Sequence, residues 1–239
     1  MNNINSALIL GSTSETAREI SLQLAKNGCK KFHLLARNQA NNEKLILELK
    51  NNFFVEVTSE IIDLKNNINP SKNLYKNYDL YIIASGYLGS KTKNKNLEEE
   101  LNIINLNFSS LIPWLKAIVT EERINKKGCL WIFSSIAGDI GRPSNYQYGA
   151  AKAGLTIYCE GLSNLCSGKP FSIRILKAGL IDTKMSRGTS PKFLFTSPNQ
   201  IAKYLLKNPF KNGIEYIPFW WHIVILILKL VPSFIIKRL

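Results

Sequence analysis

Short apolar runs alternate with longer amphipathic stretches along the chain. Residues 7–10 form the first run, which ends at Gly11, and apolar residues then recur at helical spacing from about Thr16. Further runs of strand length occupy residues 32–36, 54–57, 80–84, 130–133 and 173–176, with helix-length segments between them. This alternation predicts a doubly wound α/β fold: a parallel sheet with helices on both faces. Ligands bind such sheets at the carboxyl ends of the strands.

The bulk composition is that of a packed globular protein. At 239 residues, with 45% hydrophobic residues and no repeat or low-complexity tract, the chain is long enough for one sizeable domain. Its four cysteines show neither a CxxC pair nor metal-ligand spacing, so we expect buried free thiols and no metal site. Residues 1–6 are polar and lack the features of a secretory signal, which favours a cytoplasmic location.

A segment at the C-terminus differs from the rest, and we divide the chain into a main domain, residues 1–216, and an apolar and basic extension, residues 217–239. Residues 217–228 form an apolar run, which is followed by Lys229, Pro232, Lys237 and Arg238. A bilayer span takes about 20 residues, so this run is too short to cross a membrane. Tryptophans at one end and cations at the other suit a segment at a membrane interface. Packing on the domain, or an oligomer contact, explains the pattern equally well.

The formal net charge of +14 requires an explanation. Nucleic acid is excluded as a partner, because the lysines are scattered through polar stretches at residues 41–51, 65–76 and 91–96 without a recognisable binding motif. Two interpretations stay open. The charge favours peripheral contact with an anionic membrane or an anionic substrate, or it is a solvated basic surface that reflects a compositional bias.

The turn after the first apolar run is the first candidate binding site. It contains Gly11, Ser12, Thr13, Ser14, Glu15 and Thr16. Backbone N–H groups and the positive end of the following helix can meet a pyrophosphate here, although a turn rich in serine and threonine can equally be a simple helix cap.

Arg37 bears on the choice of nucleotide. It follows the second predicted strand, where a fold that selects NAD would place a carboxylate against the ribose 2′-hydroxyl, and Ala36 supplies none. A guanidinium can pair with a 2′-phosphate, so we expect NADP(H) to be preferred over NAD(H). The alternative is an arginine on an exposed loop.

Tyr148 and Lys152 are the strongest candidates for catalysis. A spacing of four places both side chains on one face of a helix, and a neighbouring ammonium favours the phenolate form of a tyrosine. Ser135 ends a predicted strand thirteen residues before Tyr148 and can hold a substrate oxygen as charge develops on it. Tyr146 is a rival for the tyrosine role, but no lysine follows it at that spacing.

Taken together, these motifs resemble the short-chain dehydrogenase/reductase family over about residues 5–218. The spacing from Ser135 to Tyr148 is that of the family, and the turn resembles its Gly-x-x-x-Gly-x-Gly signature with Glu15 and Ala17 in place of the second and third glycines. The resemblance implies a single Rossmann-type domain that moves a hydride between a nicotinamide and its substrate, with Tyr148 as proton donor and Ser135 orienting the carbonyl oxygen. It also implies a homo-oligomer.

The resemblance assigns further residues to the site. Asp63 and Leu64 would lie beside the adenine, and Ala84, Ser85 and Gly86 replace the family's Asn-Asn-Ala-Gly beside the ribose. Lys152 would hold the nicotinamide ribose as well as assist Tyr148. Asn107 would anchor a water molecule that connects Lys152 to solvent, with Asn105 as its rival. The segment after the sixth strand would hold the carboxamide through Ala178, Gly179, Ile181 and Thr183.

Finer features are similar to one branch, the decaprenylphosphoryl-2-keto-ribose reductases of cell-envelope polysaccharide synthesis. These features are the Gly-x-Thr-Ser-Glu turn, the helix start at residues 197–202 and the basic tail. The implied substrate is a keto-sugar, free or linked to a polyprenyl phosphate at the inner face of the cytoplasmic membrane. A lipid-like ketone, such as a 3-oxoacyl chain or a steroid, is an alternative substrate. A non-catalytic nucleotide-binding scaffold is the alternative from a different class.

Overall fold

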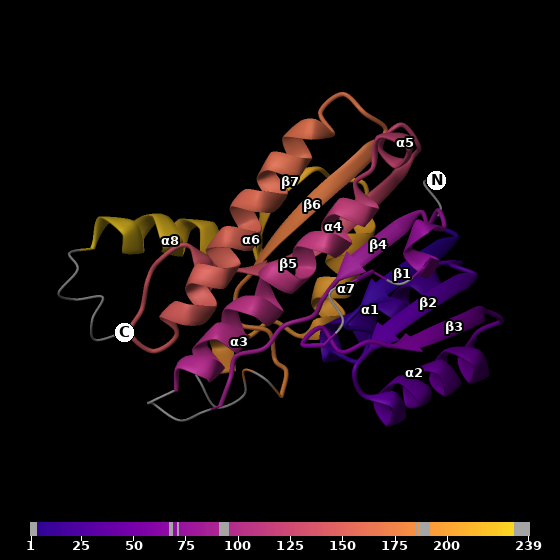
Figure 1. Ribbon diagram of the computed structural model, residues 1–239, viewed down its shortest axis with the longest axis horizontal. Coiled ribbons are helices and arrows are strands. Elements are labelled where there is room, and N and C mark those ends of the chain that lie inside the picture. Colours follow the sequence, from indigo (N-terminus) through magenta and orange to yellow (C-terminus); the bar gives the residue numbers. More distant parts are fainter. Residues whose placement is uncertain are drawn as a thin grey trace.

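Seven parallel strands form one sheet in the order β3-β2-β1-β4-β5-β6-β7 (Figure 1). The computed structural model describes residues 4–66, 69–70, 72–90, 96–184, 186 and 192–231. The strands are β1 (Ser6–Leu10), β2 (Lys31–Ala36), β3 (Glu56–Ile61), β4 (Leu80–Ile83), β5 (Gly128–Ser135), β6 (Phe171–Ala178) and β7 (Gly213–Ile217). The helices are α1 (Glu15–Lys26), α2 (Gln39–Asn52), α3 (Leu97–Asn107), α4 (Ile112–Ile118), α5 (Glu121–Ile124), α6 (Tyr146–Leu165), α7 (Pro198–Lys207) and α8 (Trp220–Leu230). Short 3-10 turns occur at η1 (Lys72–Tyr75), η2 (Ser109–Leu111), η3 (Ile136–Gly138) and η4 (Lys192–Leu194).

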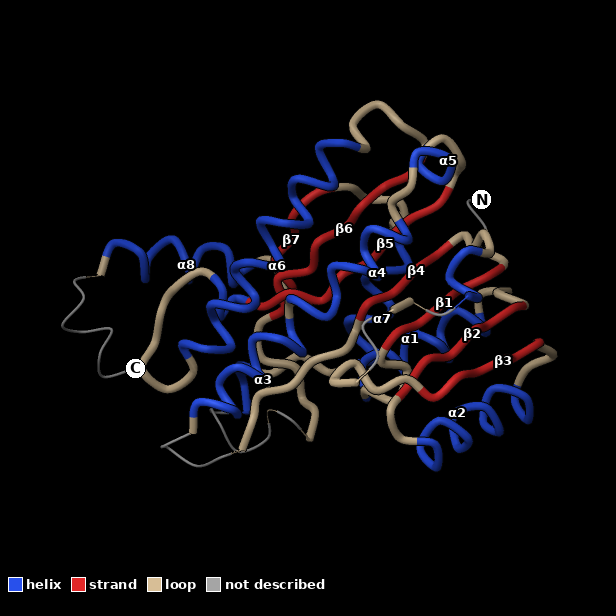
Figure 2. Tube along the Cα trace, in the orientation of Figure 1, coloured by secondary structure: helices blue, strands red, loops and turns tan. Residues whose placement is uncertain are grey.

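Helices cover both faces of the sheet (Figure 2). One buried cluster joins the sheet to α1, α2 and α7, and a second joins its other face to α4 and α6. The central strands β1, β4, β5 and β6 are almost entirely buried, because a parallel sheet covered on both sides needs continuous apolar strands. The prediction of a Rossmann-type, doubly wound single domain is confirmed.

The two edge strands differ from the sequence prediction. The expected strand at residues 54–57 lies at residues 56–61, and Phe54 is 95% exposed before it. Strand β7 was not predicted at all. Each edge strand pairs with a neighbour on one side only, so less of its surface is buried. Its sequence can therefore be shorter or more polar than that of a central strand. Apolar periodicity is therefore a weak signal at these two positions.

A buried ion pair helps to attach β7 to β6. The Arg174 Nε donates to Glu215 Oε2 at 2.7 Å, and Arg174 also donates to two backbone carbonyl groups after and within α7. Both side chains are at least nine-tenths buried. The guanidinium thereby links three elements at the edge of the sheet.

Replacing Arg174 with alanine should lower the free energy of unfolding by about 3–5 kcal/mol, because the buried Glu215 carboxylate would lose its main partner. The matched control is Arg18→Ala, which removes an ion pair with Glu48 at the surface and should cost about 1 kcal/mol or less. Urea unfolding at neutral pH measures both. Equal losses in the two variants would contradict this interpretation.

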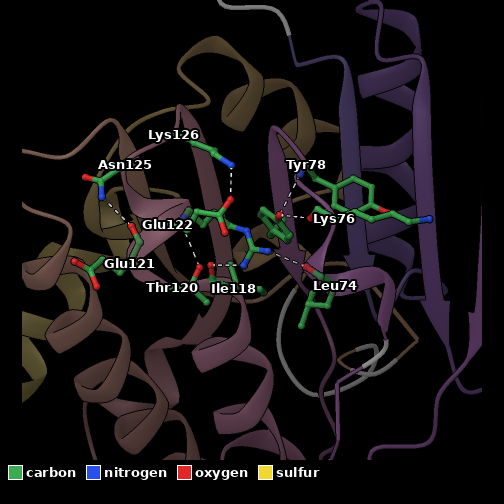
Figure 3. Close-up of polar contacts among 11 residues, drawn as sticks. Leu74, Lys76, Tyr78, Ile118, Thr120, Glu121, Glu122, Asn125 and Lys126 are labelled. Atoms are coloured by element: carbon green, nitrogen blue, oxygen red, sulfur yellow. Dashed lines mark hydrogen bonds and ion pairs between the residues drawn. The ribbon is translucent and has the colours of Figure 1, made fainter.

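Arg123 is a buried guanidinium held by backbone carbonyl groups. It donates to the carbonyl oxygens of Ala117, Ile118 (2.6 Å) and Leu74 (3.1 Å), and it lies 5.2 Å from the centre of the Tyr81 ring. Figure 3 shows Leu74 and Ile118 approaching this centre from two different segments. These contacts connect the end of α4 to η1 near the amino ends of β4 and β5, so they support the fold rather than the candidate site at the opposite edge.

The C-terminal segment forms a strand end, a turn and a helix. Ile217 ends β7, a cis peptide bond joins it to Pro218, and α8 packs on the domain through Trp221 and Ile225. Figure 1 shows α8 reaching out beyond the carboxyl ends of β6 and β7. Within the described ranges, no helix is both long and apolar enough to span a bilayer. The expected features at Pro232, Lys237 and Arg238 lie outside the described residues, and the division of the chain at residue 217 stays a prediction.

Candidate active site

The candidate cofactor turn lies where the strand order reverses, between β1 and β4. Gly11 adopts a φ of +83°, and its N–H and that of Ser12 donate to the Leu35 carbonyl at 2.8 and 3.1 Å. A Cβ on Gly11 would stand 2.6 Å from the backbone nitrogen of Ser85. Only glycine therefore lets this turn lie against the end of β4, at the position where doubly wound sheets bind ligands.

The start of α1 accounts for the residues that replace the family's glycines. The Ser14 hydroxyl caps the helix by accepting from the Ala17 N–H at 3.1 Å, and Ala17 is fully buried in the core beneath the turn. The Glu15 carboxylate accepts a hydrogen bond from the Lys184 N–H at 2.7 Å. Glu15 thus links the turn after β1 to the segment that follows β6. This link lies at the carboxyl ends of the strands, the side of the sheet where a dinucleotide would bind.

The other candidate nucleotide contacts surround this turn. Arg37 is exposed after β2, and Gly86 is exposed after β4. Asp63 accepts hydrogen bonds from the Lys65 N–H and the Asn66 side chain, so its carboxylate shapes its own turn. Leu64 is buried, Ala84 lies at the end of β4, and Thr13 and Thr16 flank Ser14 in the turn. The Ser85 hydroxyl is buried and has no partner among the described residues, which fits a site that is completed by a bound polar group.

Two glycines bring α6 against the end of β5. A Cβ on Gly138 would lie 2.7 Å from the backbone nitrogen of Ala153, and a Cβ on Gly149 would lie 2.7 Å from the Ala137 carbonyl oxygen. The Ser134 hydroxyl also donates to the Lys152 carbonyl at 3.1 Å. This close packing fixes the first two turns of α6 beside Ser135.

Tyr148, which is half-buried, and Lys152, which is buried, lie together on α6. The Lys152 Nζ is 5.7 Å from the centre of the Tyr148 ring and donates to the Phe133 carbonyl at 2.9 Å. Tyr146 differs, because its side chain is 52% exposed and its hydroxyl donates to Glu100. The structure thus brings Ser135, Tyr148 and Lys152 together and directs Tyr146 elsewhere.

Burial controls the protonation of this pair. It raises the pKa of Tyr148 to about 12, while a hydrogen bond with the Ser135 side chain opposes the rise. It lowers the pKa of Lys152 to about 8, since an ammonium loses its hydration in the interior. At neutral pH the phenol is therefore protonated and able to donate, beside a lysine that titrates just above neutrality.

Asn107 ends α3, which packs against α6. Its side chain is fully buried and bonds the backbone of Tyr87 in both directions, accepting from the N–H at 3.1 Å and donating to the carbonyl at 2.6 Å. Asn107 therefore fixes the loop that follows β4. Its role as the anchor of a water molecule stays a prediction, and Asn105, which is half-buried, stays its rival.

The segment after β6 lies next to Ser135. Ala178 pairs with Ser135 in register, and the Gly179 N–H donates to the Ile217 carbonyl at 2.9 Å. Ile181 forms a bridge to Thr196, and the Thr183 hydroxyl bonds within its own turn. The segment expected to bind the carboxamide therefore lies at the carboxyl ends of the strands, as do the other candidate site residues.

Sequence reasoning missed an ion pair at this edge. The Lys177 Nζ pairs with Asp139 of the η3–α6 connection, and both side chains are at least nine-tenths buried. Lys177 also lies 5.3 Å from the centre of the Tyr216 ring. Asp139 stands only four residues after Ser135, but its partner is distant in sequence, so no local pattern indicates the pair.

Fold and site together describe a Rossmann-type α/β domain with Ser135, Tyr148 and Lys152 grouped at the carboxyl ends of its strands. The family model for short chain dehydrogenases matches residues 5–192, well over half of the chain. The chain therefore belongs to the short-chain dehydrogenase/reductase family.

Relatives found by sequence agree with this membership. An uncharacterized oxidoreductase of Mycobacterium tuberculosis is 27% identical over 161 residues, which cover 66% of this chain and 64% of the relative. The chain thus matches somewhat less than two thirds of that relative. The 3-oxoacyl-[acyl-carrier-protein] reductase FabG of Buchnera aphidicola is 24% identical over 89% of this chain and 76% of its own length.

Solved structures share the fold at low sequence identity. The 3-oxoacyl-[acyl-carrier protein] reductase of Brucella melitensis superposes with a TM-score of 0.74 at 16% identity, covering 88% of each chain. An actinorhodin polyketide ketoreductase with NADPH gives a TM-score of 0.70 at 17% identity, covering 87% of this chain and 90% of its own.

Proposed function

We propose that this protein is an NADP(H)-dependent ketoreductase in which Tyr148 is the proton donor. The observation that carries the proposal is the position of the half-buried Tyr148 beside the buried Lys152 on α6, next to Ser135 at the end of β5. The test is NADPH oxidation in the presence of a ketone panel. The panel contains keto-sugars with and without phosphate, 3-oxoacyl thioesters, a steroid ketone, and cyclic ketones with and without a neighbouring hydroxyl.

The chain's own residues perform three tasks in this reaction. The Ser135 hydroxyl holds the carbonyl oxygen, and Tyr148 donates its phenolic proton to that oxygen as negative charge develops. The Lys152 ammonium stabilises the resulting phenolate through its position beside the ring. Proton return to Tyr148 passes through Lys152, with Asn107 as the proposed water anchor on the adjoining α3. A bound NADPH supplies the hydride.

The residues at the switch point fit a dinucleotide. We propose that the turn of Gly11 to Thr16 meets the pyrophosphate at the N-terminus of α1, where backbone N–H groups and the helix dipole favour an anion. The unpartnered Ser85 hydroxyl and the exposed Gly86 suit the ribose side of the site. Asp63 and Leu64 are proposed for the adenine, and residues 178–183 for the carboxamide.

Preference for NADP(H) is proposed on the exposed Arg37, which no described carboxylate neutralises. Replacing Arg37 with glutamine should weaken NADPH binding about 10-fold to 100-fold and leave NADH binding unchanged, because one charge-assisted contact with the 2′-phosphate is lost. Titration of the cofactor's fluorescence measures both affinities. Equal affinity of the wild-type protein for NADPH and NADH would count against this assignment.

A keto-sugar, free or carried on a polyprenyl phosphate, is the proposed substrate. Arg142 supports an anionic substrate group, because its guanidinium is half-buried in the connection between Ser135 and Tyr148 and pairs with no carboxylate in the described ranges. Burial lowers the pKa of Arg142, because the guanidinium loses part of its hydration there. The Arg142→Gln variant should raise KM for phosphorylated keto-sugars and leave neutral ketones unaffected.

A lipid-like ketone is the second candidate substrate. It is favoured by relatives named as 3-oxoacyl reductases, which cover most of the chain, and the same three residues would serve its reduction. Preferential turnover of 3-oxoacyl thioesters or the steroid ketone would replace the keto-sugar proposal. A non-catalytic scaffold is disfavoured by membership of an oxidoreductase family.

Peripheral contact with an anionic membrane, at the inner face of the cytoplasmic membrane, is proposed for α8. The helix carries exposed apolar side chains at Ile223, Leu226, Ile227 and Leu230, and Phe219 just before it is exposed as well. Vesicles with and without anionic lipid should distinguish wild-type protein from a Leu226→Gln, Leu230→Gln variant by cosedimentation. Equal lipid binding by the wild-type protein and this variant would contradict the membrane contact.

A homo-oligomer is the other proposed role of the exposed apolar surface of α8. Sedimentation velocity without lipid tests for it.

A further inference from the structure

Trp221 occupies an unusual position at the carboxyl edge of the sheet. It comes from the first turn of α8, far along the chain from every candidate catalytic residue, and its side chain is only 8% exposed. Its indole lies against the backbone of Gly179. A Cβ on Gly179 would stand 1.8 Å from the Trp221 Nε1, so the contact requires glycine.

This contact places the indole against the end of β6, the strand that pairs with β5 at Ser135. Gly179 directly follows Ala178, and Ala178 pairs with Ser135 on the neighbouring strand. Trp221 therefore packs on Gly179, which is one residue beyond the β6 residue that pairs with Ser135. The helix that carries Trp221 is the element that extends past this edge in Figure 1.

The Trp221 N–H is buried without a partner. No hydrogen-bond acceptor reaches its Nε1 in the part of the chain that the structure describes. Tryptophan N–H groups that are buried usually find a partner, and leaving one unpaired costs free energy. An unpaired donor beside a candidate active site fits a ligand oxygen that completes the bond.

Aromatic and charged side chains pair with one another near the start of α8. Trp220 stacks on Trp221 with ring centres 4.5 Å apart, and His222 stacks on Tyr216 at 4.7 Å. Tyr216 in turn covers the Lys177 ammonium, which is paired with Asp139. Aromatic side chains with a few placed polar groups are the residue types that orient small molecules in binding sites.

We propose that Trp221 is a substrate-binding residue that determines specificity, by donating its indole N–H to an oxygen next to the ketone carbon. This rests on the proposed ketoreductase function and adds the class of substrate: ketones that carry an oxygen substituent beside the reacting carbon. An oxygen-bearing ketone satisfies the buried donor, whereas a plain ketone leaves it unpaired.

The test compares 2-hydroxycyclohexanone with cyclohexanone in the wild-type protein, Trp221→Phe and the control Trp114→Phe, with NADPH. In Trp221→Phe, kcat/KM for the hydroxylated ketone should fall about 10-fold through KM, while cyclohexanone and NADPH affinity change less than about twofold. Trp221→His, which retains a ring N–H, should recover part of the loss. Trp114→Phe removes another buried indole N–H that has no partner among the described residues, but in α4, and should behave as wild type toward both ketones.

A measurement on the wild-type protein keeps the test independent of any folding defect. The indole N–H signal of Trp221 in a ¹⁵N spectrum, assigned by its loss in Trp221→Phe, should move further downfield with 2-hydroxycyclohexanone than with cyclohexanone in the presence of NADP⁺. Equal shifts and equal kinetic losses for the two ketones would overturn the proposal for Trp221. Absence of NADPH oxidation with every ketone of the panel would instead overturn the ketoreductase function.

Discussion

Replacing Tyr148 with phenylalanine should lower kcat by about 10²-fold to 10⁴-fold, the usual contribution of a positioned general acid. The phenol is the group that donates the proton, and its high pKa keeps it protonated at neutral pH. NADPH affinity should stay within about twofold, because the ring remains and Lys152 keeps its bond to the Phe133 carbonyl. Stopped turnover with intact NADPH binding, measured by absorbance and fluorescence, is the expected result.

Tyr146 provides the matched control. It stands two residues earlier in the same helix, but its hydroxyl donates to Glu100 at the surface. Tyr146→Phe should therefore keep more than about half of the wild-type kcat. If the two variants lose activity to the same extent, the proton donor is not Tyr148.

Lys152 should give the reaction its dependence on pH. Its pKa is lowered to about 8 by burial, so the ammonium is present at neutral pH and is lost as the pH rises through that value. If the ammonium stabilises the phenolate, kcat/KM for ketone reduction is constant below about pH 7 and falls above about pH 8. Rates measured from pH 6 to 10 test this, with NADPH saturating.

Two substitutions at Lys152 separate its charge from its shape. Lys152→Met should lower kcat by about 10²-fold or more and abolish the alkaline fall, since no ammonium remains to titrate. Lys152→Arg keeps a charge that does not titrate in this range, so any remaining activity should show no fall near pH 8. An unchanged alkaline limb in either variant would show that another group controls it.

The central strands could be predicted from sequence because their burial is local information. Strands β1 and β5 contain continuous apolar runs at residues 7–10 and 129–133, as expected for strands covered on both faces. Strand β7 could not be recognised, because it contains the polar Glu215, whose burial depends on Arg174 in another strand. The position of β3 was wrong by two residues at its start, since an edge strand with polar alternation gives little contrast with a loop.

The candidate site shows the same contrast. Contacts within one element can be predicted from sequence, whereas contacts between distant segments cannot. Spacing within one helix places Tyr148 beside Lys152, and a single glycine marks the turn after β1. The bond from Lys184 to Glu15 and the pair of Lys177 with Asp139 join segments that are far apart in sequence. The sequence carries no periodic signal for such contacts, so only the fold reveals them.

The contact between Gly179 and Trp221 makes the identities of these two positions interdependent. A methyl group at residue 179 would collide with the indole, so Gly179→Ala alone should displace the start of α8. The same substitution combined with a small residue at position 221 should be tolerated. Across homologues, we expect a residue larger than glycine at position 179 to occur together with a residue smaller than tryptophan at position 221. The side-chain sizes at the two positions should therefore covary.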